Sequence, residues 1–169
     1  PQWLVDRWVE SYGYEETAEM LRENNIQPVQ TVRVNTTKAT IENVLTTLER
    51  EGVKAVRSEV MPECVHLQTG QAARTAAFRH GLITIQDESS MLPANVLNPQ
   101  PGMKVLDMCA APGGKTTHMA EKMQNEGSIL AMDLHPKKLD LIEENTARLG
   151  LEIVQTAPVD GRKAASFLP

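Results

Sequence analysis

The stretch that decides the fold of this chain is KVLDMCAAPGGKTTH, residues 104–118. A short apolar run ends at Asp107, two adjacent glycines follow at Gly113 and Gly114, and a helical pattern begins directly after them. A strand, a tight glycine turn and a helix N-terminus form the layout of a nucleotide-type cofactor site, because the first N–H groups of the helix point toward the turn. The stretch therefore predicts a Rossmann-like α/β domain.

Two common cofactor loops do not match this turn. A phosphate-binding Walker loop requires a glycine at the position of Cys109, five residues before Gly114. A dinucleotide fingerprint requires three spaced glycines, and only two adjacent ones are present. The turn is therefore of Rossmann type without the signature of NAD or ATP binding.

Acidic residues follow two further apolar runs. Asp133 ends the run 128–132, where a carboxylate accepts hydrogen bonds from ribose hydroxyls in Rossmann sites. Asp160 follows the run 151–155, where an acid can accept a bond from an adenine amino group. Polar anchors at three strand ends fit an adenosine-containing ligand without a pyrophosphate. S-adenosylmethionine is the candidate that this pattern favours.

The spacing of apolar residues divides the chain into a helical lead-in at 1–28, a segment at 29–86 and a segment at 87–169. The middle segment has the ferredoxin-like order βαββαβ, shared with RNA-recognition modules. Its predicted strands are 31–35, 53–58, 64–68 and 82–86, and its predicted helices are 40–51 and 71–79. The last segment predicts half of a Rossmann-like domain, with strands 104–108, 128–132 and 152–155 and helices 87–97, 115–123 and 136–149.

Composition excludes several classes of protein. Hydrophobic residues make up 41% of the 169 residues, which is too many for a disordered chain. No apolar run approaches the ~20 residues of a membrane helix. The two cysteines, Cys64 and Cys109, form neither a disulfide framework nor a zinc-binding spacing. We therefore expect a cytoplasmic protein without a membrane segment and without a metal.

Charge gives little support for a nucleic-acid partner. The net charge is −5 and the pI about 5.4, whereas nucleic-acid-binding domains are commonly basic. Residues 29–84 are the exception, with seven basic and five acidic residues. An ordinary solvated surface explains this small excess as well. Phe78 is the one Phe, Tyr or Trp in the segment, so RNA would be held there by phosphate contacts rather than by base stacking.

The stretch Cys109–His118 resembles motif I of the Nol/Nop/Sun family of RNA cytosine-5 methyltransferases, and most closely its bacterial Sun (Fmu) branch. Pro1–Trp8, Val32–Asn35 and Gly81–Ser90 resemble further family segments in the same order, so the resemblance covers nearly the whole chain. It implies methylation of carbon 5 of a cytosine in ribosomal RNA, with 16S RNA expected and S-adenosylmethionine as the methyl donor. In this chemistry a cysteine thiolate adds to carbon 6 and activates the ring.

The resemblance assigns roles to individual residues. The residues expected to bind the cofactor are Cys109, Ala110, Ala111, Pro112, Gly113, Gly114, Lys115, Asp133, Asp160 and Lys138. The motif uses Cys109 to contact the cofactor, so we do not expect it to be the nucleophile. The basic residues of the middle segment expected to face RNA are Arg33, Lys38, Lys54, Arg57, Arg74 and Arg79.

The two cysteine motifs of the family, Thr-Cys and Asp-Ala-Pro-Cys, would follow Pro169. A NusB-like domain would precede Pro1 in the bacterial branch. We therefore expect an internal fragment that carries the cofactor-binding half of its parent and has no catalytic residue of its own. Alone it should be inactive. Two alternatives stay open: a methyltransferase of the same fold with another substrate, and an RNA-binding or scaffold module without catalysis.

Overall fold

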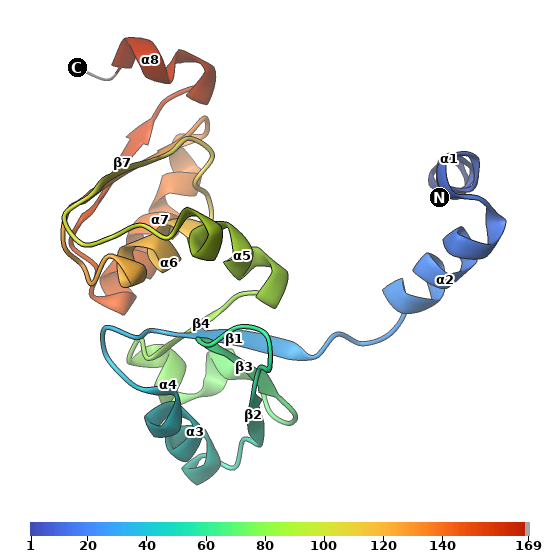
Figure 1. Ribbon diagram of the computed structural model, residues 1–169, viewed down its shortest axis with the longest axis horizontal. Helices are drawn as coiled ribbons and strands as arrows, with labels where there is room; N and C mark the ends of the chain where they lie inside the picture. Colours follow the sequence, from blue (N-terminus) through green and yellow to red (C-terminus); the bar gives the residue numbers. More distant parts are fainter. Residues whose placement is uncertain (168–169) are drawn as a thin grey trace.

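The computed structural model describes residues 1–167 and confirms both predicted folds. A helical pair at the N-terminus is followed by a four-stranded antiparallel sheet and then by a three-stranded parallel sheet. Figure 1 shows the two sheets with their helices in contact, and the helical pair standing apart at the end of an extended segment. The middle part is ferredoxin-like, and the last part is half of a Rossmann-like domain.

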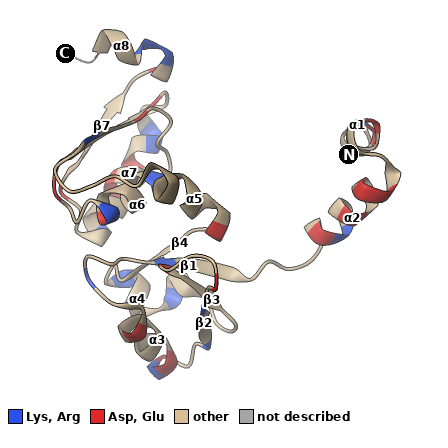
Figure 2. Cartoon of the chain, in the orientation of Figure 1, with Lys and Arg blue, Asp and Glu red and all other residues tan. Residues whose placement is uncertain are grey.

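The N-terminal pair consists of α1 (Gln2–Tyr12) and α2 (Tyr14–Asn24), joined at Gly13. No residue of α1 is buried, and Thr17 is the one buried residue of α2. Acidic side chains predominate on these helices (Figure 2). The pair therefore adds little to the apolar core of the described chain.

The ferredoxin-like part is a sheet with helices on one face. Its elements are β1 (Gln30–Val34), α3 (Ile41–Arg50), β2 (Ala55–Arg57), β3 (Cys64–Leu67), a 3-10 turn η1 (Ala72–Arg74), α4 (Ala76–Arg79) and β4 (Ile83–Ile85). The strand order is β2-β3-β1-β4, with antiparallel neighbours. Because side chains alternate along a strand, Val32 and Val34 enter the core with Val44 and Leu48 of α3. Arg33 lies on the opposite face and contacts helix α6 (Gly114–Lys122).

Three local predictions differ from the structure. The helix predicted at 71–79 is wrong, because Thr75 is extended and divides it into η1 and α4, with its hydroxyl capping the N–H of Phe78. The last strand begins at Val154, two residues later than predicted, because the Asn125 side chain accepts the N–H groups of residues 152 and 153. The helix predicted over 87–97 begins one residue later, at Glu88, and Asp87 before it makes no side-chain capping bond.

The half-Rossmann part contains α5 (Glu88–Leu97), β5 (Lys104–Asp107), α6 (Gly114–Lys122), β6 (Ser128–Asp133), α7 (Pro136–Leu149), β7 (Val154–Pro158), η2 (Gly161–Lys163) and α8 (Ala164–Phe167). Its strands are parallel in the order β5-β6-β7. Met123, Ile129 and Leu149 belong to the core between sheet and helices. Within the part of the chain that the structure describes, β5 pairs with β6 alone.

Across residues 1–167, the helices are all too short or too polar to cross a lipid bilayer.

Candidate cofactor site

Three carboxylates lie at the carboxyl ends of the parallel strands. Asp107 is the last residue of β5, Asp133 is the last residue of β6, and Asp160 lies two residues beyond β7. The ends of parallel strands meet at one edge of the sheet, which is where ligands bind in folds of this type. The loop 108–113, between β5 and α6, runs along that edge. We refer to this edge as the candidate cofactor site.

Asp107 braces the loop. One of its carboxylate oxygens accepts a 2.7 Å hydrogen bond from the Thr116 hydroxyl, in the first turn of α6. The other lies 3.4 Å from the N–H of Cys109. Both oxygens are thus engaged within the protein. Asp107 fixes the ends of the loop to each other.

Gly113 supplies the sharp turn. Its φ of +97° lies in the left-handed region, and a Cβ atom there would meet Ile142 of α7 at 3.3 Å. Only glycine combines this conformation with so close an approach. Gly114 has no such requirement, because it begins α6 and a Cβ atom there would make only ordinary contact with the Gln86 side chain, at 3.8 Å. One glycine, rather than the predicted pair, makes the turn.

Asp133 joins the loop to β6 and keeps acceptor capacity. Its carboxylate lies 3.3 Å from the N–H of Ala111 and 3.2 Å from the N–H of His135. A carboxylate offers about four acceptor positions, so these two bonds leave room for a ligand hydroxyl. Asp133 borders a cavity of about 540 Å³ that is also lined by Met108, Cys109, Leu134, Asp160, Gly161 and Arg162.

Asp160 borders the same cavity with a charged carboxylate. Its oxygens accept bonds from the Arg162 guanidinium, the shortest at 2.6 Å, and from the Arg162 N–H. These bonds lower the pKa of Asp160 to about 2. The Arg162 side chain is 87% exposed, so the pair lies at the surface and is readily rearranged. Asp133 and Asp160, predicted as separate strand-end anchors, therefore share one cavity.

A second, smaller cavity of about 240 Å³ lies on the other side of the loop. Gln86 and Asp87 line it from the β4–α5 connection and Ser90 from α5. Ala110, Ala111, Pro112, Gly114 and Lys115 line it from the loop and α6. Lys115 borders this cavity and not the one with the two acids. Lys138 is exposed in the first turn of α7 and borders neither cavity. The structure therefore separates Lys138 from the other expected cofactor residues.

The RNA-facing prediction is wrong for Arg33. Its side chain is completely buried and lies between the ferredoxin-like sheet and α6, so it is not accessible to a phosphate. The Lys38 ammonium is exposed but contacts the carbonyl oxygens of His80 and Arg148. The remaining four residues, Lys54, Arg57, Arg74 and Arg79, are exposed on the ferredoxin-like part.

The buried polar network behind the loop was not predicted from the sequence. Arg33 bonds Glu121, Thr117, Gln86 and the carbonyl oxygen of Gly114. The alternation of side chains along β1 places Arg33 on the face opposite the apolar one. It does not reveal that α6 covers the face that carries Arg33. The only local signal was an arginine in the middle of an apolar strand.

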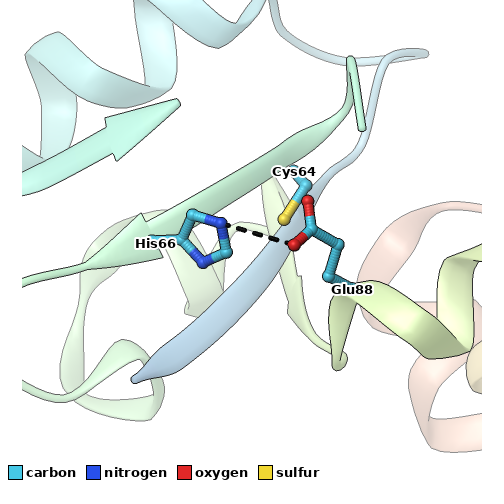
Figure 3. Close-up of side chains that lie close together, drawn as sticks. All are labelled: Cys64, His66 and Glu88. Carbon is cyan, nitrogen blue, oxygen red and sulfur yellow. Dashed lines mark ion pairs between the residues drawn. The ribbon is translucent and has the colours of Figure 1, made fainter. Parts of the chain in front are cut away.

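Three potential metal ligands lie together on the sheet face that meets α5. Atoms of Cys64, His66 and Glu88 lie within 4.8 Å of one another (Figure 3). Burial, together with the charges of Glu88 and Glu63, raises the pKa of the Cys64 thiol to about 12, so the thiol keeps its proton. His66 is held between Glu88, at 3.6 Å, and the Thr31 hydroxyl, at 3.3 Å. We interpret this cluster as a polar contact between β3 and α5.

A glycine turn between a parallel strand and a helix, with acids at the next strand ends, is characteristic of Rossmann-like methyltransferases. Two family models match the chain. The ferredoxin-like domain of RsmF/B-like methyltransferases matches residues 1–74, and the 16S rRNA methyltransferase RsmB/F model matches residues 94–168. The chain belongs to this RsmB/F family of ribosomal RNA methyltransferases.

Individual relatives agree with this assignment. The chain is 44% identical over 164 residues to the probable ribosomal RNA small subunit methyltransferase B of Bacillus subtilis, covering 97% of this chain and 37% of the relative. It is 34% identical over 168 residues to the Citrobacter koseri ribosomal RNA small subunit methyltransferase B, covering 99% of this chain and 39% of that relative. A crystal structure of a methyltransferase homolog from Pyrococcus horikoshii superimposes with a TM-score of 0.83 at 31% identity. The match covers 99% of this chain and 55% of that protein. The chain thus spans less than two fifths of these two curated relatives.

Proposed function

We propose that the full-length protein methylates carbon 5 of a cytosine in 16S ribosomal RNA, and that this chain forms the half that binds S-adenosylmethionine. The observation that carries the proposal is the cavity shared by Asp133 and Asp160, beside the turn at Gly113. Its volume of about 540 Å³ lies in the range of small-molecule sites. Family membership supports ribosomal RNA as the substrate.

Each wall of the candidate site suits one part of the methyl donor. The free acceptor positions of Asp133 suit the ribose hydroxyls, and the charged carboxylate of Asp160 suits the adenine amino group. The first N–H groups of α6 and Lys115 suit a carboxylate, since a helix N-terminus attracts negative charge. When bound, S-adenosylmethionine supplies an electrophilic methyl group.

Neither described cysteine suits the role of the attacking thiolate. Cys64 is buried and keeps its proton, and Cys109 lies within the loop that would hold the cofactor. The nucleophile is therefore proposed to lie outside this chain. RNA would approach along the exposed basic residues of the ferredoxin-like part, Lys54, Arg57, Arg74 and Arg79.

Replacing Asp133 tests the cofactor site. In the full-length protein, Asp133→Ala should weaken S-adenosylmethionine binding by roughly 1–3 kcal/mol, the scale of a lost hydrogen bond to a charged group. Titration calorimetry would measure the change. Asp140→Ala, which removes an exposed carboxylate from α7, is the matched control and should leave affinity unchanged. Equal affinities of the Asp133 variant and the wild type would remove Asp133 from the site.

A further inference from the structure

Arg33 is the most deeply buried charged residue within residues 1–167, and each of its guanidinium N–H groups has a partner. Nε donates to Glu121 at 2.8 Å, and one terminal nitrogen donates to Glu121 at 2.9 Å and to Thr117 at 3.0 Å. The other terminal nitrogen donates to Gln86 and, at 2.8 Å, to the carbonyl oxygen of Gly114. Arg33 and Glu121 are both essentially inaccessible to solvent.

These contacts link two parts of the chain that are far apart in sequence. Arg33 belongs to β1 of the ferredoxin-like sheet, whereas Gly114, Thr117 and Glu121 belong to α6, which begins at the cofactor loop. A guanidinium has a rigid planar fork, so it fixes the direction as well as the distance of its partners. The bond to the Gly114 carbonyl holds the residue at which the loop becomes helix.

The Arg33 guanidinium also bonds residues that line the second cavity. Gln86 accepts a bond from Arg33, and its own amide donates to the carbonyl oxygen of Ser90 at 2.9 Å. Gln86 and Ser90 line the 240 Å³ cavity on their side, and Gly114 lines it from the other. Arg33 therefore supports both walls of this cavity without touching its interior.

We propose that Arg33 is a positioning residue through which the ferredoxin-like part sets the conformation of the cofactor loop. The loop then has its binding geometry only when the two parts are docked. This inference rests on the function proposed above for the loop. It differs from a purely stabilising role, which any buried pair between the two parts would fill equally well.

The chain contains such a pair for comparison. Glu63, next to β3, lies 2.8 Å from His118 of α6, with side chains 9% and 2% exposed. This pair joins the same sheet to the same helix. Glu63 does not contact the loop; its described side-chain partners are His118 and Asn95. Loss of the Glu63 pair should loosen the docking without releasing Gly114.

The experiment compares two variants of the full-length protein, Arg33→Leu/Glu121→Leu and Glu63→Ala. The first removes both buried charges, so no unpaired ion remains and stability is largely kept. Hydrogen exchange of the amides at 108–116 in the ligand-free protein reports on the loop directly. We expect at least a tenfold faster exchange there in the double variant, and less than a twofold change in Glu63→Ala.

Cofactor affinity is the second measurement, made at a temperature at which circular dichroism shows all proteins folded. We expect S-adenosylmethionine to bind the double variant at least tenfold more weakly and Glu63→Ala within twofold of the wild type. Wild-type exchange rates in the double variant, or equal effects in both variants, would overturn the proposal. A wild-type protein that binds no S-adenosylmethionine would instead refute the proposed function, while the exchange data would still decide the role of Arg33.

Discussion

At the scale of single residues, the buried carboxylate of Glu63 contributes to the stability of the fold. Burial alone would raise the pKa of its carboxyl, but the His118 imidazole 2.8 Å away and a hydrogen bond from Asn95 outweigh burial and lower the pKa to about 2. Burial lowers the pKa of His118 itself, since the charged imidazole loses its water. Glu63 is therefore ionised in its contact with His118.

The lowered pKa predicts a dependence of stability on pH. A carboxyl whose pKa is about 2 when folded and 4.5 when unfolded stabilises the fold above pH 4.5 and loses that contribution as the pH falls toward 2. The free energy of unfolding should fall by about 1 kcal/mol at pH 3.5, and by about 3 kcal/mol once Glu63 is protonated in both states. Urea unfolding at pH 6 and pH 3.5 should show a smaller difference for Glu63→Gln than for the wild type. Glu49→Gln, an exposed carboxylate on α3, should behave like the wild type; identical differences in all three proteins would contradict the assignment.

At the scale of elements, the end of α7 and the turn before β4 are packed backbone against backbone. A Cβ atom on Gly81 would lie 2.1 Å from the carbonyl oxygen of Arg148, near the C-terminus of α7. Arg148 donates in turn to the carbonyl oxygens of Phe78 and Ile83, and its guanidinium lies 4.0 Å from the centre of the Phe78 ring. This contact joins the ferredoxin-like part to α7 of the half-Rossmann part, at a place apart from Arg33.

Replacing Gly81 should therefore separate these elements. Gly81→Ala combines a left-handed backbone with a steric clash and should destabilise the chain by about 3 kcal/mol or more. Gly52→Ala is the control, because Gly52 has a similar φ of +75° but open space around it, and should cost about 1 kcal/mol. Thermal unfolding of the two variants measures the difference. Equal losses would mean that the close contact is relieved without cost.

Elements with local signals could be predicted from the sequence, and those without could not. Pro136 at the first turn and Gly150 after the last turn define α7, which was predicted with the observed bounds. The spacing of apolar residues predicts a helix through Thr75, whereas its backbone is extended because it caps a turn that only the fold creates. Asp133 was predicted from its place at a strand end. The location of Arg33 depends on the docking of α6, which no local pattern reports.

Across the whole molecule, the ferredoxin-like and half-Rossmann parts form one body, and the N-terminal helices contribute little to it (Figure 1). No residue of α1 is buried, and Trp3 and Tyr14 are 65% and 77% exposed. Removing residues 1–27 should therefore lower the unfolding temperature of the 169-residue chain by less than about 3 °C, corresponding to under ~1 kcal/mol. Scanning calorimetry on both chains would measure it, and a much larger decrease would show that the helices pack on the body in solution.

The wide separation of Arg33 and Glu121 in the sequence has a consequence for folding during synthesis. Glu121 is synthesised 88 residues after Arg33, an interval of roughly 5 to 20 seconds at ribosomal speed. The four strands of the ferredoxin-like sheet end at Ile85, so all of them are synthesised before Glu121. Arg33 must keep its water until α6 arrives, since burying an unpaired charge is prohibitive. The Arg33 face of the sheet therefore stays exposed to solvent at first. Its burial is completed only after the cofactor loop and α6 have been translated.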